Sequence, residues 1–299
     1  MFEYLEIGKK IYNTDNPREA RRMVVFVART ILNSRRMASL KKFFQQNELL
    51  AQIAEEYAFV YEQPTRAFFY NKSNFEERAQ LVEQHMLYLT EILQPEVVLG
   101  LYKAQRYVLW EKQHDQQTLA LSLYYHPGQR KEGLLSVMLT LGEQELYQMM
   151  VWIAPDKAGE MSLWIGAMQG PNMENAKDVI KKITKECHAY RTKNLILHAT
   201  QEVAKALDLQ HIYGVTNYGY YANNHVRRDR KLKTSFSDFW EEAGGKPSGD
   251  ERFFVLPMTE YRKDMEEIPT RKRANYRKRF ALLDEIDAAI AEGIGKLRK

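Results

Sequence analysis

Cysteine occurs once in this chain of 299 residues, at Cys187. A single thiol excludes a disulfide framework within the chain and a zinc site built from several cysteines, and it favours a reducing compartment. No run of 18 apolar residues occurs, so no membrane-spanning helix is expected. The first 22 residues show no secretory signal pattern. We therefore expect a protein of the cytoplasm.

Several catalytic motifs are also absent. The seven histidines are scattered, without an HxxxH or HExxH spacing, and no GxSxG, Walker or GxGxxG sequence occurs. A classical hydrolase, a P-loop NTPase and a Rossmann dehydrogenase therefore find no support. We expect no metal site.

Positive charge is concentrated in two short segments. The chain carries 44 basic and 39 acidic residues, a net charge of +5, which matters only where the cations cluster. RRDRKLK at 227–233 has five cations in seven residues, and RKRANYRKR at 271–279 has six in nine. Such clusters suit anionic lipid headgroups or nucleic-acid phosphates. Binding of single-stranded nucleic acid also needs aromatic side chains between the cations, and Tyr276 is the only such residue in these two segments. We therefore regard a nucleic-acid partner as unlikely and rank it third. A solvated helix balanced by nearby acidic residues is the remaining alternative.

The periodicity of apolar residues predicts three regions. Residues 1–112 read as helices that pack on a core, residues 113–260 as an α/β core, and residues 261–299 as a basic C-terminal helix. Within the core, 118–169 contains four apolar runs of strand length with short turns, which predicts an antiparallel meander. Two helices over 174–210 then lead to a strand at 211–217, which indicates a crossover and parallel pairing. A short helix and a strand at 251–258 close the core.

This order predicts an α+β fold with a mixed, mainly antiparallel sheet flanked by helices. It is also the element order of the GNAT-type acyltransferase core, which is an analogy at the level of fold.

The stretch SFSDFWEEAGG at 235–245 predicts the short helix. Ser235 is expected to cap it, and Gly244 or Gly245 to end it in the left-handed conformation. Phe239 and Trp240 lie about 100° apart on a helix, so they form a broad apolar face. We expect Trp240 to anchor the core and form a wall of a site, and we regard Glu241 as a candidate substrate contact.

Several short motifs carry a family resemblance. They are RKEG at 130–133, IGAMQGP at 165–171, TKECHAYRTKNLILHA at 184–199, GVTN at 214–217, HVRR at 225–228 and SFSDFWEEAGG at 235–245. In this combination and order the chain resembles the VirK/YbjX family of Gram-negative bacteria. The resemblance implies a link to virulence, envelope remodelling and resistance to cationic antimicrobial peptides, but it implies no particular reaction.

Three residues are candidates for proton transfer. Glu132 of RKEG is a possible carboxylate base, and His188 is a histidine that can titrate near neutral pH. The positive cluster beside His225 would lower its pKa and keep it neutral, as a base requires. The alternative roles are a solvated turn for Glu132, a helix cap for His188 and a surface position for His225.

Five residues are candidates for binding a donor. Arg191, Lys193 and Asn194 open an amphipathic helix, whose free N–H groups suit a phosphate. Gly170 permits a close backbone approach and Gln169 can hydrogen-bond a ligand amide. A plain helix–helix turn and a strand that simply ends at Gly170 are the alternatives.

Two functions follow from these observations. The first is a GNAT-like acyltransferase that uses acyl-CoA or another acyl thioester on an envelope component or protein amine, with Asn217, Arg227, Trp240 and Glu241 contacting the substrate. The second is a non-catalytic peripheral membrane or envelope-stress protein that binds anionic lipid through its basic segments at the inner face of the inner membrane. The sequence leaves the oligomeric state open.

Overall fold

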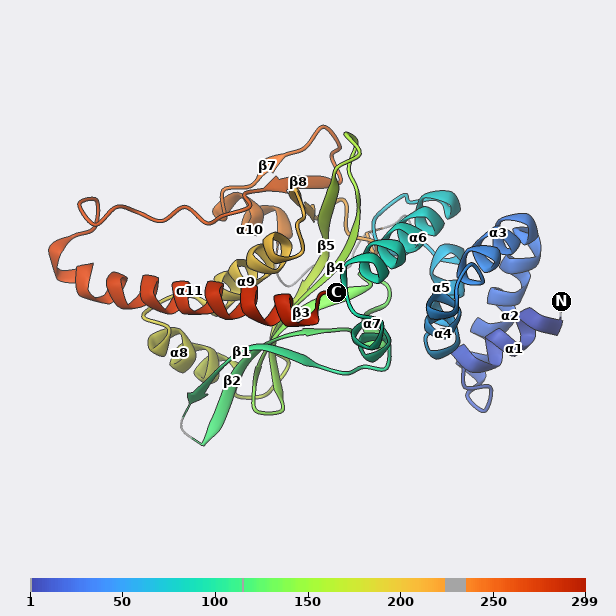
Figure 1. The fold of residues 1–299 in the computed structure, drawn as a ribbon, viewed down its shortest axis with the longest axis horizontal. Helices are drawn as coiled ribbons and strands as arrows, with labels where there is room; N and C mark the ends of the chain where they lie inside the picture. Colours follow the sequence, from blue (N-terminus) through green and yellow to red (C-terminus); the bar gives the residue numbers. More distant parts are fainter. Residues whose placement is uncertain (1, 115, 224–234) are drawn as a thin grey trace.

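A computed structural model of the chain describes residues 2–114, 116–223 and 235–299. An array of helices comes first (Figure 1). These helices are α1 (Phe2–Ile11), α2 (Pro17–Leu32), α3 (Ser34–Phe44), α4 (Glu48–Glu56), α5 (Phe59–Glu62), the 3₁₀ turn η1 (Gln63–Thr65), α6 (Phe75–Ile92) and α7 (Pro95–Tyr102). Local sequence fixes their starts: Asn74 and Glu77, for example, form a capping box at the head of α6.

A single eight-stranded sheet follows within the described residues, in the order β1-β2-β3-β4-β5-β6-β8-β7. Its strands are β1 (Tyr107–His114), β2 (Gln117–Tyr124), β3 (Leu135–Leu141), β4 (Gln144–Pro155), β5 (Met161–Gln169), β6 (His211–Val215), β7 (Lys246–Pro247) and β8 (Phe253–Leu256). β1 to β5 form an antiparallel meander, β5 and β6 are parallel, and the remaining pairs are antiparallel. The predicted meander and the predicted parallel crossover are therefore confirmed.

Helices cover both faces of the sheet. Besides the N-terminal helices, the helical elements are the 3₁₀ turn η2 (Pro127–Gln129), α8 (Ala176–Glu186), α9 (Thr192–Ala206), α10 (Phe236–Glu242) and α11 (Thr270–Leu297). Trp240 of α10 packs on Gly214 of β6, whereas Tyr213, the preceding residue, faces a pocket that α6 also lines. Because successive strand residues point to opposite faces, α10 and α6 lie on opposite sides of the sheet. The long helix α11 packs on α9 and on the edge strand β1.

The N-terminal helices and the sheet share one continuous hydrophobic core. Two boundaries differ from the sequence prediction. β1 begins at Tyr107, so the predicted edge of the helical region at residue 112 falls inside a strand. α11 begins at Thr270 rather than near residue 262, because Pro269 precedes the helix and disfavours a helical residue before it.

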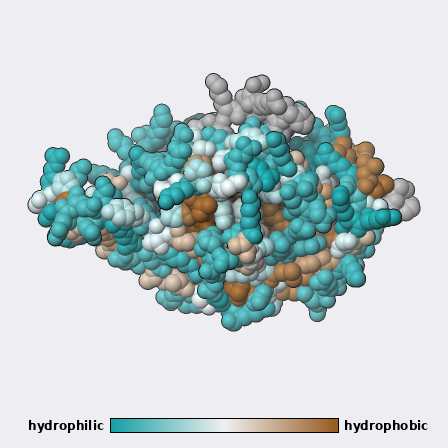
Figure 2. Space-filling model, turned by 90° about the horizontal axis from the view of Figure 1, so that it is seen from above, coloured by the Kyte–Doolittle hydropathy of each residue, from teal (hydrophilic) through white to brown (hydrophobic). Residues whose placement is uncertain are grey.

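One helix carries apolar side chains on its solvent face. Val24 is 64% exposed, Ile31 46% and Leu32 83%, so α2 holds three of the six large hydrophobic residues exposed in the described chain. Figure 2 shows apolar surface at the end of the molecule that the N-terminal helices form, whereas most of that view is hydrophilic. This exposure is unusual for a surface helix, whose apolar stripe normally faces the core.

Candidate functional site

The parallel strands β5 and β6 separate at a β-bulge. Val151 of β4 pairs with Ile165 and Met150 pairs with Ala167, so Gly166 is an extra residue in β5. β6 ends at the level of this bulge, whereas β5 continues beside β4 to its end. A crevice at the carboxyl ends of parallel strands is where open α/β sheets usually bind their ligands.

The 130–133 turn lies directly on this bulge. A Cβ atom added to Gly166 would lie 1.9 Å from the carbonyl oxygen of Glu132 and 2.7 Å from the Trp152 ring, so only glycine fits there. The turn is held by its backbone, since the N–H of Phe69 donates to the Lys131 carbonyl at 2.7 Å and the N–H of Glu132 donates to the Gln129 carbonyl at 2.9 Å. These contacts place Glu132 over the ends of the parallel strands.

Glu132 forms a carboxylate–phenol pair with Tyr220. The Tyr220 hydroxyl donates to Oε1 of Glu132 at 2.7 Å. Tyr220 follows β6, where its N–H donates to the Thr216 carbonyl at 3.0 Å. Burial, and then the charge of Glu132, raise the pKa of Tyr220 above its ordinary value, so the phenol keeps its proton. A base and a proton donor in direct contact are the parts that general acid–base chemistry needs.

Sequence reasoning selected Glu132 but missed Tyr220. The signal available was the aromatic run YGYY at 218–221, which follows GVTN directly. Nothing local distinguishes a tyrosine that packs from one that meets a carboxylate 88 residues earlier in the chain.

Asn217 joins the end of β6 to the start of α10. Its Oδ1 accepts the N–H of Phe236 at 2.7 Å, its Nδ2 donates to the Ser235 hydroxyl at 2.9 Å, and its own N–H donates to the Ser237 hydroxyl at 3.1 Å. The predicted substrate contact thus has partners within the protein. The amide group positions the start of α10 beside the end of β6.

The short helix α10 matches its prediction closely. Ser235 caps it by accepting the N–H of Asp238, and Gly244 follows it with a φ of 83°. Trp240 is fully buried and donates to the Val215 carbonyl at 2.8 Å, which confirms it as a core anchor. Glu241 is exposed on α10, and its role as a substrate contact stays a prediction.

The predicted donor cations share a protein carboxylate. Glu242 pairs with Arg191 and, at 2.7 Å, with the Lys193 ammonium, and Lys193 also lies over the Phe239 ring at 4.6 Å. Asn194 is the next residue of α9, and its buried Oδ1 has no partner in the described part of the chain. A phosphate at this helix end would compete with Glu242, so the donor role of these residues stays a prediction.

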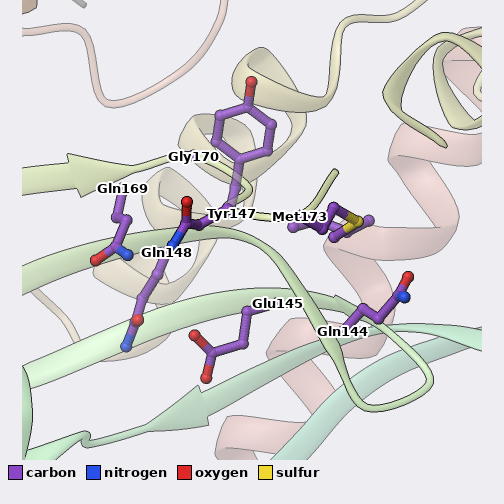
Figure 3. A pocket seen from close by; sticks show the side chains of 9 residues that line it. Gln144, Glu145, Tyr147, Gln148, Gln169, Gly170 and Met173 are labelled. Carbon is purple, nitrogen blue, oxygen red and sulfur yellow. The ribbon is translucent and has the colours of Figure 1, made fainter. Parts of the chain in front are cut away.

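A pocket of about 280 Å³ lies between the start of β4 and the end of β5 (Figure 3). Gln148 and Gln169 are paired across the two strands, and Tyr147 points to the other side of β4 from Gln148. Gln169 accepts from Gln129 Nε2 at 2.9 Å. The buried Oε1 atoms of Gln129 and Gln148 have no hydrogen-bond partner among the described residues. The predicted residues Gln169 and Gly170 therefore line a pocket together with Gln148, whose Oε1 is an unused acceptor.

His188 lies away from Glu132. It ends α8 in the left-handed conformation, with a φ of 55°, and its carbonyl accepts from Asn275 at 2.8 Å and from Arg279 Nη2 at 2.9 Å. Burial, and then the charges of Lys112, Lys278 and Arg279, lower its pKa. These cations belong to the edge strand β1 and to α11, so the structure does not bring His188 to the bulge. The other predicted residues His225 and Arg227 lie outside the described residues.

Among the residues that the structure describes, two groups of side chains bring together nitrogen and oxygen atoms that could coordinate a metal ion. They are Asp156, Glu160 and His211, and His198, Glu202 and Asp287. Each group has a structural explanation in the protein. Asp156 accepts the N–H groups of Ala158 and Glu160 in a turn, and Asp287 pairs with Arg262 at 3.0 Å. No sequence spacing pointed to either group.

Comparison with known proteins places the chain in a family. A family model described as a protein of unknown function (DUF535) matches residues 15–292. The chain belongs to the DUF535 family. An uncharacterized protein of Haemophilus influenzae is 26% identical over 274 residues, covering 89% of this chain and 87% of the relative. The uncharacterized protein YbjX of Escherichia coli is 30% identical over 182 residues, covering 60% of this chain and 54% of the relative.

These matches confirm the resemblance to VirK/YbjX proteins. No solved structure matches the DUF535 chain. None of its described helices combines the length and apolar character that a bilayer crossing requires.

Proposed function

We propose that this DUF535 protein is an acyltransferase with a GNAT-like core and an acyl-thioester donor. The observation that carries the proposal is the Glu132–Tyr220 pair at the diverging ends of β5 and β6. The meander, the crossover and the bulged strand support the GNAT-like description, because they follow the order that such a core requires. Fold alone assigns no reaction, so the site residues carry the argument.

Glu132 would accept the proton of an acceptor amine as its nitrogen attacks the acyl carbon. The new bond is C–N, the bond that breaks is C–S, and the Tyr220 phenol would protonate the departing thiolate. Because the two side chains are hydrogen-bonded, the proton on Glu132 can then pass to the phenolate and restore the starting state. Such positioned proton transfer typically contributes about 10²–10⁴-fold to a rate.

The 280 Å³ pocket would hold the amide-bearing arm of the donor. An acyl-CoA arm carries amide N–H groups, which match the unused Oε1 acceptor of Gln148 in the pocket wall. Gln169, which lines the pocket, accepts from Gln129 Nε2, and the Gln129 carbonyl accepts the N–H of Glu132. The donor pocket and the proton-transfer pair therefore share one structural support.

A thiol-release assay tests this proposal. The purified protein is incubated with acyl-CoA of several chain lengths and a panel of primary amines, and free coenzyme A is measured with a thiol reagent. Glu132→Gln should lower the rate by roughly 10²-fold or more, whereas Glu91→Gln, at an exposed carboxylate of α6, should leave it unchanged. Equal rates in the two variants, or no thiol release with any donor, would reject the assignment.

A second candidate function is peripheral binding to an anionic membrane. The favouring observation is the solvent face of α2, where Val24, Ile31 and Leu32 are exposed beside Arg18 and Arg21. An amphipathic helix of this kind buries its apolar face at a lipid interface while its cations meet anionic headgroups. In the basic segment 271–279, by contrast, Arg273 and Arg279 donate to backbone carbonyls of the protein.

A vesicle sedimentation assay can distinguish lipid binding by α2 from lipid binding by the basic segment 271–279. Leu32→Asp should reduce binding to vesicles that contain phosphatidylglycerol, whereas neutralising Arg271, Lys272, Arg277 and Lys278 should reduce it only if α11 is the contact. Binding should weaken with salt, because the attraction is screened. Equal binding to neutral and anionic vesicles would exclude this function.

A further inference from the structure

A strongly cationic pocket of about 460 Å³ lies between the N-terminal helices and the 130–133 turn. Its cationic side chains belong to Arg22, Arg29, Arg66, Arg130 and Lys131, and its acidic ones to Glu19 and Glu62. Five cations against two carboxylates leave an excess of three positive charges. The rest of the wall is partly apolar, from residues such as Phe59 and Phe68.

The carboxylate of Glu62 organises two of these cations. Glu62 has no exposed surface. Its Oε2 accepts from Arg130 Nε at 2.6 Å, and its Oε1 accepts from Arg66 at 3.2 Å and from the Tyr12 hydroxyl at 2.5 Å. The Arg130 guanidinium also lies over the Phe59 ring at 4.1 Å. One buried anion therefore holds two guanidinium groups in place and neutralises only one of them.

Two further cations have no carboxylate partner in the described part of the chain. Arg29 donates to the Thr65 carbonyl at 3.1 Å, and Lys131 forms no ion pair with a described residue. Burial, and then the neighbouring Arg130, lower the pKa of Lys131. Burial, and then Arg66, likewise lower the pKa of Arg29. In both groups burial is the larger cause, and the neighbouring cation acts in the same direction.

The pocket adjoins the proton-transfer pair. Lys131 lines the pocket and directly precedes Glu132, and Tyr221 lines it and directly follows Tyr220. The backbone of the 130–133 turn and of the 220–221 segment therefore joins the pocket wall to the Glu132–Tyr220 pair.

We propose that this pocket binds the phosphate group of a phosphorylated ligand. Guanidinium groups present paired N–H donors that match phosphate oxygens, and a lysine adds a point charge. Arg66 and Arg130 are preorganised by Glu62, while Arg29 and Lys131 supply the uncompensated charge. The phosphorylated ligand would be the acyl acceptor. This assignment rests on the proposed acyl transfer, whereas phosphate binding itself does not.

Calorimetric titration with pyrophosphate tests the binding site. The full chain should bind pyrophosphate with an affinity that falls as salt rises. Lys131→Met should weaken binding roughly 10-fold or more, since it removes a charged hydrogen-bond donor from the pocket. Lys42→Met removes the same charge from an exposed position on α3 and should bind as the parent does.

Folding of the Lys131→Met variant is checked by urea unfolding. Because Lys131 is crowded by other cations, this substitution should leave the unfolding midpoint unchanged or raise it. If the parent fails to bind millimolar pyrophosphate, or if Lys131→Met binds as tightly as Lys42→Met, the phosphate site is rejected.

Competition with free coenzyme A assigns the ligand. Simultaneous binding of coenzyme A and pyrophosphate supports an acceptor phosphate, because the donor then occupies a separate place. Displacement of pyrophosphate by coenzyme A would overturn the acceptor assignment. Failure of acyl transfer itself would appear in the thiol-release assay and would leave pyrophosphate binding intact.

Discussion

The Nδ1 atom of His85 accepts the backbone N–H of Ile153 at 2.9 Å in the middle of the core. Its other ring nitrogen lies 3.2 Å from the Tyr102 hydroxyl, which donates to the Leu134 carbonyl. The imidazole is fully buried, and burial lowers its pKa to about 3. The neutral His85 on α6 thus links the helical region to β4 through a hydrogen bond to Ile153. Ile153 lies two residues after Val151, which is next to the bulge.

This histidine predicts a pH-dependent stability. In the unfolded chain its pKa is about 6.5, so between pH 6.5 and about 3 the unfolded state binds the extra proton. The contribution of His85 to the free energy of unfolding is fully present above pH 6.5. It decreases as the pH falls, by up to about 1.4 kcal/mol per pH unit. Urea unfolding at pH 7, 5.5 and 4.5 measures the slope.

The matched variant is His85→Asn, which keeps an acceptor for Ile153 but cannot be protonated in this range. It should be less stable than the parent at pH 7 and should lose less stability on acidification. His126→Asn, at an exposed turn, should keep the parent slope. Parallel pH profiles for the parent and His85→Asn would contradict the assignment.

The bulge predicts a contrast between two glycines. Gly166→Ala places a Cβ atom 1.9 Å from the Glu132 carbonyl oxygen, so the turn or the strand must move. We expect a loss of about 1–3 kcal/mol, typical of overpacking, and reduced thiol release because Glu132 shifts. Gly170→Ala meets the Tyr147 ring at an ordinary 3.4 Å and should change stability by less than about 0.5 kcal/mol. Urea unfolding of both variants decides the matter, and equal losses would refute the geometry.

The N-terminus of α9 can be tested by removing its internal competitor. Glu242→Gln frees Arg191 and Lys193 from their shared carboxylate. If these cations bind donor phosphates, coenzyme A should bind several-fold more tightly to this variant by calorimetry. Glu241→Gln, one residue away and exposed, is the control. Unchanged coenzyme A affinity in Glu242→Gln would place the donor phosphates elsewhere.

Most of the sheet could be predicted because its strands are marked by the sequence of each segment alone. The runs that became β2 to β5 are apolar over a strand length and separated by turn residues, and the crossover follows from two helices between strands. β1 was missed because YVLWEKQH, at the sheet edge, is half exposed and reads as mixed. The cap at Ser235 and the left-handed Gly244 were predictable because caps depend on neighbouring residues.

The site was harder to predict because its pairs are distant in sequence. Glu132 meets Tyr220, and Arg191 meets Glu242, and no local pattern selects those partners. The cationic pocket depends on Glu62, which lies in a helical stretch read as packing alone. The sequence indicates which side chains can act as bases or bind anions, but it does not show which distant side chains pair with them.

Glu62 provides the last prediction, which joins stability to the phosphate site. Glu62→Gln leaves Arg66 and Arg130 without their buried carboxylate, and breaking a buried pair in this way costs about 3–5 kcal/mol. Glu19→Gln removes a partly exposed partner of Arg22 in the same pocket and should cost no more than about 1 kcal/mol. Pyrophosphate should restore more stability to Glu62→Gln than to the parent, because the variant pocket has one more uncompensated positive charge. Thermal unfolding with and without pyrophosphate measures this difference, and an equal shift in both proteins would show that the anion binds away from Glu62.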